Sequence, residues 1–132
     1  MPFGAEVFTI SGAFDAAACP AGWKATPKGN CAGPGGRAAP AASALQNALR
    51  SLGKAAGDKA LAATAVDGIV GPGTAAAVNR AFTVHIGPGQ AAANLRSGKL
   101  TKFDVAQNAP TLTQIITGLK YIRGRYGDPE SA

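Results

Sequence analysis

The segment Asp67-Gly68-Ile69-Val70-Gly71-Pro72-Gly73-Thr74 constrains the fold of this chain more than any other stretch. Gly68 and Gly71 permit backbone angles that are costly for other residues, which is typical of a tight loop. The carboxylate of Asp67 can accept hydrogen bonds from nearby backbone N–H groups, and Pro72 is suited to the first turn of a helix. The segment therefore predicts a fixed loop that leads directly into a helix.

Apolar residues recur at helical spacing on both sides of this loop. Ser43 is a good N-cap residue for a first helix, and Gly53 is expected to end it. Asp58 can cap a short second helix that carries Leu61. The helical faces hold Leu45, Ala48, Leu49 and Leu52 before the loop and Thr74, Ala77, Val78, Ala81 and Phe82 after it. This pattern predicts three small helices over residues 43–84.

The C-terminal third of the chain has helical signals of its own. Thr101 is suited to an N-cap with Asp104 at position N3, so a short helix is expected over residues 102–107. Residues 90–95 can form one or two helical turns. A regular apolar stripe then occupies Leu112, Ile115, Ile116, Leu119 and Ile122. We expect this stripe to close the domain's own core, with a subunit interface as the alternative.

Residues 1–42 differ in character from the rest, because they hold most of the prolines and several Gly-rich runs. Regular helix is disfavoured there, so we interpret this stretch as an extended arm outside the core. Residues 6–10 have the composition of a short strand that could augment the sheet of another subunit. The expected organisation is this arm, one helical domain over residues 43–126, and a tail over residues 127–132.

Cys19 and Cys31 are the only cysteines, and they enclose a Pro/Gly-rich stretch. One interpretation is a disulfide between them, which would stabilise the fold by about 3 kcal/mol. The other is a pair of reduced thiols in a cytoplasmic protein. We favour the disulfide, and it would place the mature protein in an oxidising environment such as a released virion.

The chain carries a formal net charge of +6 and has a pI near 9.8, which favours approach to anionic polymers. The basic residues are scattered and do not alternate with aromatic ones, which argues against nucleic-acid binding. The first residues lack a basic region followed by an apolar stretch, so no signal peptide is expected. No apolar run is long enough for a membrane span.

Catalytic and metal-binding patterns are weak in this sequence. His85 is the only histidine, and its apolar neighbours favour a packed residue over a ligand or a base. A zinc site built from Cys19, Cys31 and His85 would lack the close paired spacing of structural zinc motifs. The carboxylates show no spacing typical of a glycosidase pair. We therefore predict no enzymatic activity, no metal and no cofactor.

Two linked motifs carry a resemblance to a known family. They are Leu45-Gln46-x-x-Leu49-x-x-Leu52-Gly53 and Val66-Asp67-Gly68-Ile69-Val70-Gly71-Pro72-x-Thr74-x-x-Ala77-Val78-x-x-Ala81-Phe82. Their order and spacing resemble the peptidoglycan-binding domain family, a three-helix module often appended to cell-wall hydrolases. The sequence departs from the family pattern at Gly53-Lys54, where the family has Gly-aromatic, and at Phe82-Thr83, where it has Phe-Gln.

The resemblance implies a mainly α fold: a small helical bundle of the peptidoglycan-binding-domain type, here with an N-terminal arm and an additional C-terminal helix. It also implies noncatalytic binding of peptidoglycan through a shallow groove beside the turn and the helix that follows. The residues expected at this surface are Asp67, Gly68, Ile69 and Thr74, together with the polar candidates Asn79 and Arg80, which the motif does not specify.

The partners expected from this reading are peptidoglycan or another anionic wall polymer, and other structural subunits contacted through the arm. The protein would then be a wall anchor or a component of a bacteriophage particle. It would be located in the virion if phage-encoded, and otherwise in the cytoplasm or outside the cell after nonclassical export. The alternative is a purely structural phage assembly protein, such as a capsid decoration or tail component, that uses the fold for subunit contacts.

Overall fold

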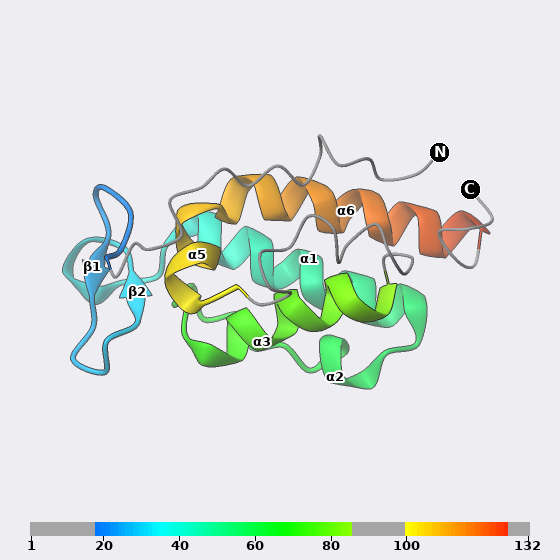
Figure 1. Ribbon diagram of the computed structural model, residues 1–132, viewed down its shortest axis with the longest axis horizontal. Coiled ribbons are helices and arrows are strands. Elements are labelled where there is room, and N and C mark those ends of the chain that lie inside the picture. The colour runs from blue at the N-terminus through cyan, green and yellow to red at the C-terminus, as the bar shows by residue number, and fades with distance from the viewer. Residues whose placement is uncertain (1–17, 86–99, 127–132) are drawn as a thin grey trace.

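A computed structural model describes residues 18–85 and 100–126 of the chain (Figure 1). The α-helices are α1 (Pro40–Ala56), α2 (Lys59–Ala62), α3 (Pro72–Arg80), α5 (Lys102–Gln107) and α6 (Ala109–Tyr126). A π-helical turn, η3 (Ala81–His85), extends α3, and a 3-10 turn, η2 (Pro34–Gly36), precedes α1. Strands β1 (Lys24–Ala25) and β2 (Cys31–Ala32) form a small antiparallel sheet. The prediction of a mainly α fold is therefore confirmed.

Helices α1 and α6 run side by side along the molecule and form the centre of the core (Figure 1). The buried apolar residues are Leu45, Leu49 and Leu52 on α1, and Leu112, Ile115, Ile116 and Leu119 on α6. Burial of each such side chain contributes about 2 kcal/mol to the hydrophobic stabilisation. The C-terminal stripe as far as Leu119 thus closes the domain's own core, as expected. The side chain of Ile122, residues 90–95 and the strand expected at residues 6–10 lie outside the described residues.

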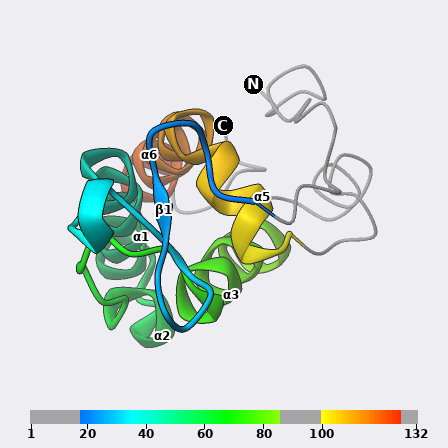
Figure 2. The same ribbon diagram turned by 90° about the vertical axis from the view of Figure 1, so that its left-hand side faces the viewer.

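The end-on view shows α6 and α3 on opposite sides of the molecule, with α1 and α5 between them (Figure 2). Helix α1 starts earlier than expected, with Pro40 at its first position, and it continues beyond Gly53 to Ala56. The prediction that Gly53 ends the helix is therefore wrong. A Cβ at this glycine would lie 2.2 Å from the backbone nitrogen of Ala62, so Gly53 is needed for the close approach of α2. Gly57, with φ at 70°, ends α1 instead.

Other local predictions agree with the structure. The Asp58 carboxylate caps α2 by accepting hydrogen bonds from the backbone N–H groups of residues 60 and 61. Thr101 and Asp104 form a reciprocal capping box at the start of α5. Pro72 occupies the first turn of α3. Over the described residues, no helix combines the length and the apolar character needed to cross a bilayer.

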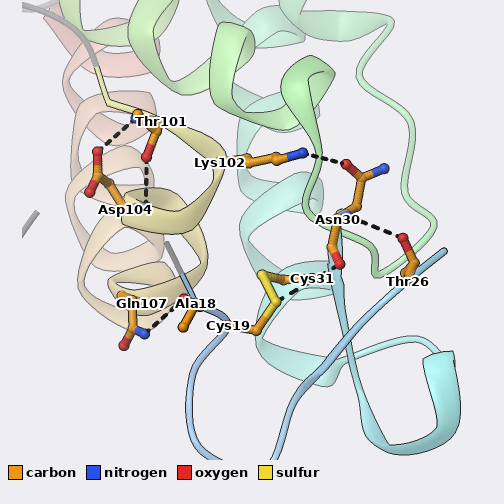
Figure 3. Close-up of a disulfide and its surroundings, with 9 residues drawn as sticks. All are labelled: Ala18, Cys19, Thr26, Asn30, Cys31, Thr101, Lys102, Asp104 and Gln107. Carbon is orange, nitrogen blue, oxygen red and sulfur yellow. Dashed lines mark hydrogen bonds between the residues drawn. A yellow bond between two sulfur atoms is a disulfide. The ribbon is translucent and has the colours of Figure 1, made fainter. Parts of the chain in front are cut away.

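The described part of the N-terminal segment packs against the helices. Cys19 and Cys31 form a disulfide with an S–S distance of 2.08 Å, which confirms the favoured pairing (Figure 3). Cys31 exchanges two backbone hydrogen bonds with Val70, at 3.0 and 2.8 Å, and the backbone N–H of Ala39 donates to the Gly68 carbonyl at 2.9 Å. Cys31 and Ala39 are also members of the buried core. These residues were expected in an arm outside the core, but long-range backbone bonds fix the Gly/Pro-rich segment against the loop before α3.

Candidate binding groove

The loop before α3 is held in place by the side chain of Gln46, which is 1% exposed. Its Nε2 donates to Asp67 Oδ1 at 3.0 Å, to Thr74 Oγ1 at 3.0 Å and to the Ile69 carbonyl at 3.1 Å. Its Oε1 accepts from the backbone N–H groups of Asp67 and Gly68, at 3.1 and 2.8 Å. The amide of Gln46 therefore joins α1, the loop and the first turn of α3 into one rigid unit.

Local backbone geometry and close packing explain why Asp67, Gly68 and Gly71 occupy their positions in the loop. Asp67 Oδ1 also accepts from the backbone N–H of Ile69 at 3.0 Å, which closes a local turn. Gly68 has φ at 72°, as predicted for a residue in the left-handed region. Gly71 does not, because its φ is −131°. A Cβ at Gly71 would instead lie 3.0 Å from the side chain of Asn30, so close approach explains this glycine.

A groove of about 470 Å³ runs between α2, the loop and α3. Four of the six predicted site residues line it: Asp67, Ile69, Thr74 and Arg80. The opposite wall includes residues 60, 61 and 63–65, and Asn30 contributes from the N-terminal segment. The fold thus brings together polar side chains of both charge signs along one open surface.

The other two predicted site residues have structural contacts away from the groove lining. Gly68 is buried, and a Cβ there would approach the Cβ of Ala38 to 2.5 Å. Asn79 is half-buried, and its side chain donates to the Leu100 carbonyl at 2.9 Å and accepts from the Leu100 N–H at 2.8 Å. Asn79 therefore connects α3 to the segment that precedes α5.

Asp58 and His85, which the sequence analysis did not link to the site, lie behind Arg80. Arg80 Nε donates to both carboxylate oxygens of Asp58, at 3.1 and 2.9 Å. His85 Nε2 lies 2.8 Å from Asp58 Oδ2, and the side chains of Asp58 and His85 are 4% and 6% exposed. His85 Nδ1 is buried, and no described residue forms a hydrogen bond with it. The sequence separations of 22 and 27 residues leave no local signal for this cluster.

The cluster determines the ionisation of Asp58. Burial raises the pKa of Asp58, but hydrogen bonds from His85, from Arg80 and from the backbone N–H of Leu61 outweigh it. The nearby charge of Arg80 acts in the same direction, and the pKa falls from 3.8 to about 2. Asp58 is therefore a carboxylate at neutral pH, and the adjacent His85 Nε2 acts as a hydrogen-bond donor to it.

The lowered pKa of Asp58 predicts a loss of stability in acid. Because the folded state binds this proton less tightly than the unfolded chain, the stabilisation is complete above pH 4 and disappears as the pH falls through 2. We expect the free energy of unfolding to fall by about 2 kcal/mol from this group. Urea unfolding at pH 5 and at pH 2 measures the change. Asp58→Asn should lose less stability over the same interval, and equal losses in the two proteins would contradict the assignment.

Within residues 18–85 and 100–126, no group of three or more His, Cys, Asp or Glu side chains could hold a metal ion. Comparisons of the chain with protein-family models, with curated proteins and with solved structures find no match. The geometry of the groove and the resemblance of residues 45–82 are therefore the basis for a functional proposal.

Proposed function

We propose that the protein binds peptidoglycan without catalysis and that the groove beside the Asp67–Thr74 loop is the binding surface. The observation that carries this proposal is the position of the groove, since it lies between the loop and α3 where the family resemblance implies ligand contact. A concave surface with a few polar groups on a rigid frame is typical of ligand sites. The hydrogen bonds of Gln46 supply that frame.

Charge and chemistry of the groove support the same proposal. The side chains of Asp67, Thr74 and Arg80 offer acceptors and donors of the kind that bind sugar hydroxyls, amides and carboxylates. The net charge of +6 favours encounter with an anionic wall polymer. None of the described residues that line the groove is aromatic, so contacts with them would be polar and would not stack on sugar rings.

The disulfide supports a final location in an oxidising environment, such as the bacterial surface or a released virion. Disulfides persist in such places and are rare in the reducing cytoplasm. Cys19 and Cys31 also fix the segment that carries Asn30, a residue of the groove wall. The Cys19–Cys31 disulfide is therefore consistent with a protein that meets the cell wall outside the cytoplasm.

Co-sedimentation with purified peptidoglycan sacculi tests the proposal. Ala76 is exposed and lines the groove, so Ala76→Trp should fill it and lower retention on sacculi about tenfold or more. The matched control is Thr117→Trp, which adds the same indole to an exposed position on α6, away from the groove lining. Thermal unfolding should show that both variants are folded.

Retention of the wild-type protein and of Thr117→Trp, with loss of Ala76→Trp, is the expected result. Failure of the wild-type protein to sediment would overturn the proposal and favour a purely structural role in particle assembly. Equal retention of the two tryptophan variants would place any wall contact outside the groove.

A further inference from the structure

We propose that Arg80 binds a carboxylate of the ligand, and that Asp58 and His85 are positioning residues that aim its guanidinium into the groove. The ligand group would be a free carboxylate of a peptidoglycan stem peptide, so the inference rests on the proposed function and specifies its chemistry. It assigns the end of α3, and not the conspicuous loop before it, as the place where charge is recognised.

The hydrogen bonding of Arg80 supports this role. Its Nε is used by the two oxygens of Asp58, whereas no side chain or carbonyl of the described residues accepts a hydrogen bond from Nη1 or Nη2. The side chain is 47% exposed and lines the groove. The outer edge of the guanidinium is therefore open, and two parallel N–H groups match the two oxygens of a carboxylate.

Both carboxylate oxygens of Asp58 are themselves held in place. Its Oδ1 accepts from the backbone N–H groups at the start of α2, and its Oδ2 lies 2.8 Å from the buried ring of His85. A rigid carboxylate behind Nε restricts the rotation of the arginine, so less conformational entropy is lost when a ligand binds.

The distribution of charge in the groove predicts how a ligand would be oriented. Among the described residues of the lining, the charged side chains are those of Asp67 and Arg80. Asp67 and Thr74 lie close together, because both accept a hydrogen bond from the Gln46 amide. Arg80 follows Thr74 by six residues on α3, which corresponds to about 9 Å along the helix axis. An anionic group is attracted to the Arg80 end and repelled from the Asp67 end. The uncharged donors and acceptors of a ligand would then lie near Thr74.

Nuclear magnetic resonance titration of the full chain tests the inference directly. The probe is an N-acetylmuramoyl dipeptide with a free peptide carboxylate, compared with the same compound after amidation of that carboxylate. The free acid is expected to shift the Nε–H resonance of Arg80 and the groove resonances, and to bind about tenfold or more tightly than the amide. Equal affinities for the two probes would overturn the inference.

Variants separate a specific contact from general attraction to a basic protein. Arg80→Gln should weaken binding of the free acid about tenfold or more and leave binding of the amide unchanged. Arg37→Gln removes the same charge at an exposed position outside the groove and should have little effect. Arg80→Lys should recover only part of the affinity. An ammonium lacks the planar set of N–H groups that lets a guanidinium bind Asp58 on one edge and the ligand on another. Asp58→Asn should weaken binding of the acid while Arg80 is still present.

The result can be separated from that of the sacculus experiment. Retention on sacculi with no preference for the free acid would leave wall binding standing and overturn the role of Arg80. Preference for the free acid without retention on sacculi would support Arg80 as a carboxylate site and overturn peptidoglycan as its polymer. Full affinity of Arg80→Gln for the acid would overturn the inference whatever the sacculi show.

Discussion

Replacement of Gln46 by alanine is expected to lower the free energy of unfolding by about 4 kcal/mol. The change removes the donor Nε2 and the acceptor Oε1 of a buried amide. The backbone N–H groups of Asp67 and Gly68 then lose the acceptor that they share. A buried donor without a partner costs about 1–3 kcal/mol, and the Nε2 contacts to Asp67 and Thr74 are lost as well.

Urea unfolding followed by circular dichroism measures the effect of Gln46→Ala. The control is Asn47→Ala, which removes an exposed carboxamide one residue further along α1 and should change stability by less than about 0.5 kcal/mol. Gln46→Glu is an informative second variant, because it keeps an acceptor but brings a carboxylate against Asp67 Oδ1. A loss below about 1 kcal/mol for both Gln46 variants would show that the loop does not depend on this amide.

Substitution of alanine for Gly53 is expected to destabilise the protein by about 3 kcal/mol. The added methyl group would lie 2.2 Å from the backbone nitrogen of Ala62 and 2.7 Å from the carbonyl carbon of Leu61. Both atoms belong to the backbone of α2 and cannot be relieved by a change of rotamer. Helix α2 would have to move away from α1, and it would carry the buried Leu61 side chain with it.

Gly73→Ala is the matched control for Gly53→Ala, because it adds the same methyl group where no atom lies within 4 Å. Gly73 lies in the first turn of α3, so alanine there should preserve or raise stability by up to about 1 kcal/mol. The difference between the two midpoints in a thermal unfolding experiment isolates the steric contact from helix propensity. Similar midpoints would contradict the close approach of α1 and α2.

The sequence predicted those parts of the structure that depend on neighbours a few residues apart. The cap at Asp58, the capping box at Thr101 and the first-turn proline at position 72 each involve partners within one helical turn. The apolar stripes predicted α1 and α6 because helical periodicity reports which face is buried. The same local rule failed at Gly53, where the reason for a glycine is a helix that packs against it.

The candidate site was predicted only in part, because its geometry depends on contacts across the chain. The resemblance included Gln46, but its role in holding the loop rests on hydrogen bonds that span 21–28 residues. Arg80 was named as an exposed polar residue, whereas its pairing with Asp58 has no local sequence signal. Asn79 was named on the same basis and proved to bind the backbone of Leu100. Neighbouring positions on one helix thus differ in role through partners that lie 21 and 22 residues away.

The pairing of Cys31 with Val70 determines which residues must stay together if the helices are transferred to another chain. Cys31 pairs antiparallel with Val70 in the loop before α3, and the side chain of Asn30 occupies the space that Gly71 leaves open. Transfer of the helices alone would leave two backbone groups of Val70 without partners and one end of the groove without a wall. The smallest transferable unit is therefore larger than the helices that carry the sequence motif. It extends back to Cys19, and a recombination junction between Cys31 and Pro40 would divide it.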